Sequence, residues 1–266
     1  MVQISAAGQD RANDVARVAA EAGMTIDQRG SGRPVLLLHG GGGPVSVSAF
    51  ADDLSRRYHV VAPTHAGFAG TARPAEIGTV KDLAHRYLTL LERSGLEDVL
   101  AIGCSIGGWI AAEMAASGSR RLAGLVLVDA VGIAVPGQAV LDVFSIAPQD
   151  LASFSFHAPE RYRIDPTTMT AQQAAAMRAN FATLAVYGRA QNMQDPDLRE
   201  RLATVQVPAL VVWGESDRVV WPEYGRSFAN AFPQGRFEMI SACGHLPQIE
   251  QPAKLLELVE DFAAGL

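Results

Sequence analysis

The chain has 266 residues, a net charge of -6 and a pI near 5.5, with 48% hydrophobic and 19% charged residues. This composition supplies a large apolar core and excludes a disordered chain, and the length suits a single elaborated α/β domain. The acidic balance, without a run of Lys and Arg, provides no attraction for nucleic acid or an anionic membrane, so neither is expected as a partner.

The N-terminal residues 1–23 carry charges throughout and lack the basic-then-apolar pattern of a signal peptide. No apolar run reaches the roughly 18 residues of a membrane span. Cys104 and Cys243 are the two cysteines, which is too few for a disulfide framework in a chain of this length. A cytoplasmic protein is therefore expected, as a monomer or a homodimer.

Apolar runs and helical patterns alternate along most of the chain. A helix is predicted over residues 10–22 and a strand over 24–30. Further strands are predicted over 35–39, 58–63, 99–103, 125–130, 209–214 and 236–240, and further helices over 48–57, 80–95, 106–118 and 222–232. Strands that alternate with helices favour a mostly parallel sheet covered on both faces.

The alternation stops between residues 133 and 205, a stretch too long for a simple loop. Residues 170–191 and 195–205 are rich in helix formers, so an inserted helical cap is predicted. The expected organisation is a core made of residues 1–132 and 206–266, with a cap over 133–205.

A Gly-Cys-Ser-Ile-Gly segment, from Gly103 to Gly107, joins a predicted strand to a predicted helix. This G-x-S-x-G pattern is typical of a nucleophile elbow, in which the glycines allow a strained turn to approach its neighbours closely. Ser105 is the predicted nucleophile. The following helix directs N–H groups toward an anion beside Ser105, so Ile106 N–H is a candidate oxyanion donor. The simpler interpretation is that Ser105 only caps the helix.

A serine nucleophile needs a base, and the base needs an orienting carboxylate. His245 follows the strand over 236–240 and Asp217 follows the strand over 209–214, so both are expected at the same sheet edge as Ser105. His245 is the predicted general base and Asp217 the predicted acid. Asp129, at the end of another strand, is the alternative acid.

Four segments, HGGGGP, GCSIGG, GESDRVV and CGHLPQIEQP, together resemble the α/β-hydrolase superfamily. The resemblance extends from about residue 25 to the C-terminus and includes the chain order Ser, Asp, His. It implies an α/β-hydrolase fold: a mostly parallel, eight-stranded sheet flanked by helices, with a helical cap inserted after the sixth strand. It also implies that Gly41 N–H is the second oxyanion donor, with Gly42 as a neighbouring candidate.

The remaining histidines are not predicted to be catalytic. His39 stands beside the oxyanion glycines and is interpreted as structural, holding the loop through its own hydrogen bonds. No spacing of His or Cys predicts a metal site. Gly40 to Gly43 lack both the Gly-Lys-Ser/Thr of a phosphate loop and the third glycine of a dinucleotide fingerprint, so no cofactor is expected. Cys104 is expected to pack as a small apolar side chain.

The predicted reaction is acyl transfer to water, with a small-molecule acyl substrate. A carboxylic ester or a lactone is expected, an acyl homoserine lactone being one example. A serine nucleophile argues against haloalkane dehalogenase or epoxide hydrolase activity, because those reactions need a carboxylate nucleophile.

Three alternative functions stay open. The glycine-rich HGGG segment resembles carbon–carbon bond hydrolases of aromatic meta-cleavage products. That group typically has asparagine before the nucleophile and tryptophan after the histidine, where this chain has Cys104 and Leu246. The same triad also suits a cofactor-free perhydrolase, and some proteins of this fold are non-catalytic receptors for small ligands.

Overall fold

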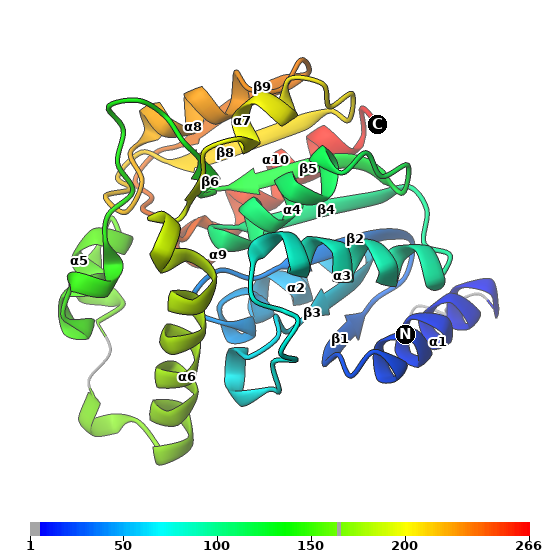
Figure 1. The fold of residues 1–266 in the computed structure, drawn as a ribbon, viewed down its shortest axis with the longest axis horizontal. Coiled ribbons are helices and arrows are strands. Elements are labelled where there is room, and N and C mark those ends of the chain that lie inside the picture. The colour runs from blue at the N-terminus through cyan, green and yellow to red at the C-terminus, as the bar shows by residue number, and fades with distance from the viewer. Residues whose placement is uncertain (1–5, 164–165) are drawn as a thin grey trace.

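The computed structural model describes residues 6–163 and 166–266, so the first five residues of the N-terminal stretch lie outside it. Seven strands form one sheet in the order β1-β3-β2-β4-β5-β8-β9 (Figure 1). The strand bounds are β1 (Ile26–Arg29), β2 (Arg33–Leu38), β3 (Tyr58–Pro63), β4 (Val99–Cys104), β5 (Leu122–Val128), β8 (Ala209–Gly214) and β9 (Gly235–Ile240). Strand β1 pairs antiparallel with β3 and the other pairs are parallel. The predicted fold class is confirmed.

The number of strands differs from the eight that the family resemblance implied, because the described residues place seven in this sheet. Near the N-terminus, the helix predicted over residues 10–22 is present as α1 (Ala6–Glu21). Its apolar residues recur at helical spacing, so Val15, Val18 and Ala19 enter the core from one side of the helix. The insertion accordingly follows β5, the fifth strand of this sheet.

Apolar side chains cover both faces of the sheet. Alternate residues of each central strand point to opposite faces, as Leu36 and Leu37 of β2 do, and both are fully buried. One face packs against α1, α3 (Val80–Arg93), α4 (Ile106–Ala116) and α8 (Pro222–Ala229), and the other against α2 (Ser48–Leu54) and α10 (Pro252–Ala263). Each buried leucine contributes about 1.5–3 kcal/mol relative to exposure.

Between β5 and β8 the chain leaves the sheet, and Figure 1 shows α5 and α6 standing beyond its edge. The elements of this segment are β6 (Gly132–Ile133), α5 (Leu151–Ser155), α6 (Ala171–Gly188), β7 (Gln194–Asp195), α7 (Leu198–Leu202) and several short 3-10 helices. Helix α6 begins at a capping box made by Thr170 and Gln173. The described residues of this segment thus include three α-helices, and the cap as a separate unit stays a prediction.

Helix α7, at the end of this segment, packs on the body of the protein. Leu198 and Leu202 are fully buried in the main core. Arg201 donates to the Glu113 carboxylate of α4 at 2.8 and 2.9 Å. The end of the cap at residue 205 stays a prediction, and these contacts attach α7 to α4 of the core.

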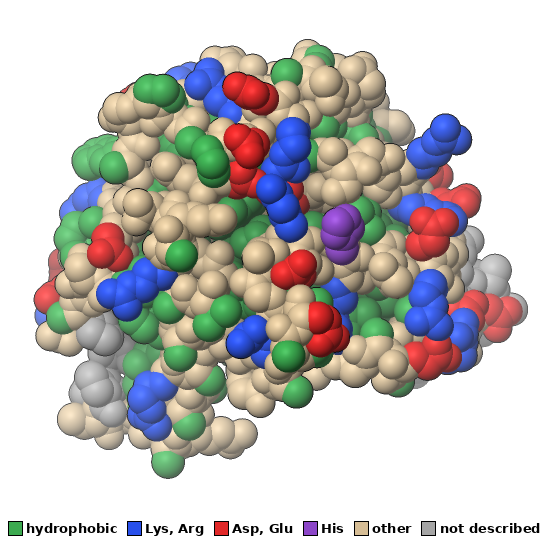
Figure 2. All heavy atoms as spheres, viewed as in Figure 1, with side chains coloured by type: hydrophobic (Ala, Val, Ile, Leu, Met, Phe, Trp, Pro, Cys, Tyr) green, Lys and Arg blue, Asp and Glu red, His purple; other side chains and the backbone are tan. Residues whose placement is uncertain are grey.

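Acidic and basic side chains are interleaved over the face shown in Figure 2. Lys81 of α3, for example, forms an ion pair of 2.7 Å with Asp195 of β7. Within residues 6–163 and 166–266, no helix is long and apolar enough to cross a membrane.

Candidate active site

Ser105 lies at the turn between β4 and α4, with a φ of 53° and a ψ of -117°. Such angles are strained for a residue other than glycine and persist only where the surroundings impose them. A Cβ atom on Gly103 would overlap the backbone of Gly107, and one on Gly107 would overlap the carbonyl oxygen of Leu38. The two glycines are therefore required by close backbone packing, as the nucleophile-elbow pattern predicts.

Ser105, His245 and Asp217 form a chain of hydrogen bonds. His245 Nε2 lies 3.1 Å from Ser105 Oγ, and His245 Nδ1 lies 2.8 Å from Asp217 Oδ2. Because an ionised carboxylate only accepts, Nδ1 carries the ring proton and Nε2 is left to accept the serine proton. The other Asp217 oxygen accepts the N–H groups of Val219 and Val220 at 2.8 and 3.0 Å, which fixes the carboxylate. The structure thus brings together the three residues predicted from the sequence.

The loops that carry Asp217 and His245 pack directly on each other. Ser216 N–H donates to the carbonyl of Cys243 at 2.8 Å. A Cβ atom on Gly214 would overlap the carbonyl oxygen of Gly244, so this contact also needs a glycine. Strands β8 and β9 are parallel neighbours, and their carboxyl ends deliver both side chains to one edge of the sheet.

Asp129, the alternative acid, lies beside Asp217. One oxygen from each carboxyl group and one ring nitrogen of His245 all lie within 4.8 Å of one another. The hydrogen bond to His245 comes from Asp217, while Asp129 Oδ1 accepts Gly214 N–H at 2.9 Å. Asp217 is therefore the residue placed to orient the histidine.

Among the described residues, Asp129, Asp217 and His245 form the one cluster of side chains close enough together to bind a metal ion. A metal bound to His245 Nδ1 would displace the ring proton that binds Asp217. The arrangement is better explained as a hydrogen-bonded network than as a metal centre.

Candidate oxyanion donors lie next to Ser105. A Cβ atom on Gly40 would come within 3.3 Å of Ser105 Cβ, so the glycine segment adjoins the nucleophile. Within the described residues, the N–H groups of Ile106, Gly41 and Gly42 donate to no protein acceptor. These three N–H groups are free to donate to an oxyanion formed at Ser105.

Two buried histidines anchor the glycine segment. His39 Nδ1 lies 2.8 Å from the carbonyl of Gly40, and His39 Nε2 accepts His65 N–H at 3.0 Å. His65 Nδ1 lies 2.6 Å from the hydroxyl of Tyr87. Burial lowers the pKa of His39 to about 4, so its ring is neutral at neutral pH. His39 thus holds the glycine segment through its own hydrogen bonds, which is the structural role expected of it.

Helix α6 is bound to the loops beside the nucleophile. Leu184 lies so close to Gly41 that a Cβ atom on the glycine would come within 2.9 Å of it. Three further side chains of α6 donate to backbone carbonyls: Asn180 to Gly42 at 2.9 Å, Thr183 to Gly67 at 2.9 Å and Tyr187 to Ala66 at 2.8 Å. Asn180 also accepts Ala69 N–H at 2.6 Å. The cap segment thus supports the oxyanion loop, which sequence reasoning did not foresee.

Glu250, the last residue of α9 (Pro247–Glu250), is another residue that sequence reasoning missed. Its carboxylate accepts N–H groups from Gly244 at 2.6 Å, from His157 at 3.1 Å and from Ala158 at 3.3 Å. It therefore joins the loop of His245 to the chain that follows α5. The only signal in the sequence was that Glu250 shares the segment CGHLPQIEQP with His245.

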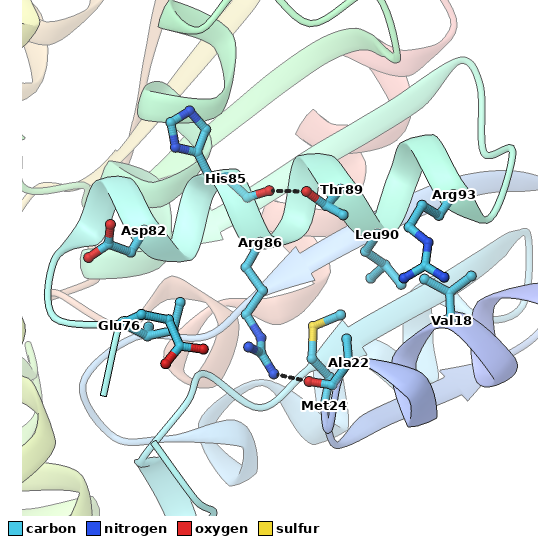
Figure 3. Close-up of a pocket in the computed structure, with 11 residues that line it drawn as sticks. Val18, Ala22, Met24, Glu76, Asp82, His85, Arg86, Thr89, Leu90 and Arg93 are labelled. Carbon is cyan, nitrogen blue, oxygen red and sulfur yellow. Dashed lines mark hydrogen bonds between the residues drawn. The ribbon is translucent and has the colours of Figure 1, made fainter. Parts of the chain in front are cut away.

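A cavity of about 480 Å³ lies between α1 and α3, and none of the residues of the Ser-His-Asp site lines it (Figure 3). Apolar side chains such as Val18 and Met24 face polar side chains of α3 across it. Arg86 is held there by a hydrogen bond to the carbonyl of Ala22. The hydroxyl of Thr89 in this lining donates to the backbone carbonyl of His85 rather than to a side-chain base, so the cavity is not a candidate catalytic site.

A Ser-His-Asp chain at the carboxyl edge of a mostly parallel sheet is the arrangement found in α/β hydrolases. The profile of the alpha/beta hydrolase family matches residues 35–258, and the chain belongs to that family.

Individual relatives include enzymes of two kinds. The chain is 27% identical to a 2-hydroxymuconate semialdehyde hydrolase of Pseudomonas putida over 90% of each chain. It is 28% identical to Lipase 3 of Moraxella sp. (strain TA144), over 89% of this chain and 79% of the relative. A meta-cleavage product hydrolase from Pseudomonas fluorescens IP01 superposes with a TM-score of 0.74 and 22% identity, over 90% and 93% of the two chains.

The superposition supports the fold alone, and together the comparisons make the chain an α/β-hydrolase enzyme. They give no support for the lactone that the sequence suggested.

Proposed function

We propose that the protein hydrolyses a carboxylic ester through an acyl-enzyme formed on Ser105. The observation that carries this proposal is the hydrogen-bonded chain from Ser105 through His245 to Asp217. His245 Nε2 takes the serine proton as Oγ attacks the carbonyl carbon, and then gives that proton to the leaving alcohol. His245 next takes a proton from water as the water attacks the acyl-enzyme, and it returns that proton to Ser105 Oγ as the carboxylic acid leaves.

The negative charge that develops on the substrate oxygen is held by backbone N–H groups. Ile106 N–H stands at the start of α4, and Gly41 N–H comes from the glycine segment. One such donor is worth roughly 2.7–4 kcal/mol of transition-state stabilisation.

A second candidate function is carbon–carbon bond hydrolysis of a meta-cleavage product, favoured by the similarity to 2-hydroxymuconate semialdehyde hydrolase. Two residues favour the ester instead. Cys104 is buried in the core, where the group that cleaves carbon–carbon bonds typically has asparagine, and Leu246 replaces its tryptophan. Both replacements remove groups able to hydrogen bond with a polar substrate.

A fluorophosphonate probe tests the nucleophile without knowledge of the substrate. The parent enzyme and a control variant, Ser227→Ala on α8, should be labelled, whereas Ser105→Ala should not. Hydrolysis of p-nitrophenyl esters should fall by a factor on the order of 10⁴–10⁶ in Ser105→Ala. An unlabelled parent enzyme would indicate a receptor that binds small ligands without turnover.

A comparison of kcat/KM on short- and long-chain p-nitrophenyl esters and on 2-hydroxymuconate semialdehyde separates the two reactions. We expect the higher value for an ester. A higher value for the semialdehyde would replace the proposal with carbon–carbon bond hydrolysis.

A further inference from the structure

Asp129 is a fully buried carboxyl group with no part in the steps above. It follows β5 with a φ of 44°, and its N–H donates to the carbonyl of Val212 at 3.0 Å. Its Oδ1 accepts Gly214 N–H, but its Oδ2 is buried and has no hydrogen-bond partner among the described residues. An orphaned buried oxygen is costly, so its persistence needs an explanation.

The surroundings of Asp129 are negative and apolar. One carboxyl oxygen of Asp217 lies within 4.8 Å of an oxygen of Asp129, and the charge of Glu250 also raises the pKa of Asp129. The thiols of Cys104 and Cys243 lie close enough for their own pKa values to be raised, mainly by burial and then by Asp129. Among the described residues, no Lys or Arg pairs with Asp129 or Asp217.

Two ionised carboxylates cannot hydrogen bond to each other, because each only accepts. Two like charges buried side by side without a cation are strongly unfavourable, and a single shared proton removes the conflict. Asp217 already uses its oxygens for two N–H groups and for His245, whereas Asp129 accepts one N–H group. Burial and then the Asp217 carboxylate raise the pKa of Asp129 well above its usual range.

We propose that Asp129 is a neutral carboxylic acid whose Oδ2–H donates to the carboxylate of Asp217, and that it is a positioning residue for the triad. The proton gives the orphaned Oδ2 a partner and turns a repulsion into an attraction. The one remaining negative charge stays on Asp217, which faces His245. The inference rests on the proposed function, since Asp217 must serve a working triad for its position to matter.

Two substitutions of Asp129 separate its hydrogen bonds from its charge. In Asp129→Asn, the amide oxygen accepts Gly214 N–H and the amide nitrogen donates to Asp217, so kcat should stay within about 2-fold of the parent value. Asp129→Val has a similar size but neither group, so kcat should fall roughly 10- to 100-fold with little change in KM. The rescue by asparagine is the outcome that a merely space-filling residue would not produce.

The pH–rate profile discriminates between a neutral and an ionised Asp129. If Asp129 is neutral, Asp129→Asn changes no charge and the rising limb of the profile stays in place. If Asp129 is ionised, its removal takes a negative charge from beside His245, and the limb moves to lower pH by about one unit. Such a shift would overturn the proposal.

Infrared spectroscopy tests the protonation state without any turnover. The difference spectrum between the parent and Asp129→Asn should contain the carbonyl band of a protonated carboxylic acid at neutral pH. The control Asp261→Asn, at an exposed position on α10, should show only carboxylate bands. Absence of the acid band overturns this inference even in an active enzyme, whereas failure of fluorophosphonate labelling overturns the proposed function even when the band is present.

Discussion

The sheet edge and the segment over residues 133–205 position the same site in different ways. At the sheet edge, Ser105 follows β4 directly, Asp217 and His245 stand in the loops after β8 and β9, and these loops pack backbone against backbone at glycines. The inserted segment is made mostly of helices and turns, and it reaches the site through both side chains and backbone: Asn180 donates to the carbonyl of Gly42, and the carbonyl of Ser155 accepts His245 N–H. The sheet edge places the reacting groups, and the insertion holds the loops that carry them.

The insertion supports the site from two sides. Helix α6 holds the glycine segment through Asn180. The chain around α5 holds the histidine loop, where His245 N–H donates to the carbonyl of Ser155 at 2.8 Å and Glu250 completes the junction. Substitutions at the sheet edge should therefore have larger effects than substitutions that break its contacts with the insertion. Four substitutions test this difference.

The largest effect is expected at the sheet edge, from Asp217→Asn. Asparagine would donate toward His245 Nδ1 and favour the wrong tautomer, so kcat should fall roughly 10⁴-fold with the fold intact. Steady-state hydrolysis of p-nitrophenyl esters and circular dichroism measure the two quantities, with Asp261→Asn as the control. If Asp217→Asn kept most of the rate and Asp129→Asn lost it, Asp129 would be the orienting acid.

The next effect concerns the stability of the glycine segment in acid. The pKa of His39 is about 4 when folded and 6.5 in its ordinary state, so the unfolded chain binds more protons between these values. The contribution of His39 to the free energy of unfolding is present above pH 6.5 and falls by about 3 kcal/mol as the pH drops to about 4.

The free energy of unfolding, measured by urea denaturation, should fall less between pH 7 and pH 4.5 in His39→Gln than in the parent. The raised pKa of Asp129 acts in the opposite direction, but it is common to both proteins and cancels in the comparison. A parallel NMR titration should find the His39 ring neutral at pH 5. Equal losses in the two proteins, or a charged ring at pH 5, would contradict this prediction.

A smaller effect is expected where the insertion meets the oxyanion loop. Asn180→Ala removes one donor from Gly42 and one acceptor from Ala69, so kcat on esters should fall roughly 10-fold. KM should change less, because the loop stabilises the transition state rather than the bound ester. Gln172→Ala, at an exposed position on the same helix, is the matched control. An unchanged kcat would show that α6 covers the site without supporting it.

The smallest effect is expected from Glu250→Gln. The amide keeps the shape but points a donor at N–H groups that need an acceptor, so kcat should fall roughly 3- to 10-fold. Glu223→Gln, at an exposed position on α8, should leave the rate unchanged. A loss as large as that of Asp217→Asn would mean that the two regions do not differ in the way described.

The sequence determined the parts of the molecule that depend on neighbours along the chain. The apolar runs of β2, β4 and β8 predict buried parallel strands, because both faces of each strand carry apolar side chains. The elbow at Ser105 could be predicted because a sharp strand-to-helix turn demands glycines at fixed positions. The order of Ser105, Asp217 and His245 at strand ends then predicts that they meet.

Tertiary structure decided everything that depends on contacts between distant segments. Nothing near Asn180 or Glu250 in the chain indicates that one would hold Gly42 and the other His157, because these partners are brought together only by packing. The number of strands is also of this kind, because the family resemblance implied eight strands and the described residues pair seven in the sheet. The pairing of Asp129 with Asp217 is of the same kind, since it depends on two separate strands ending at one point.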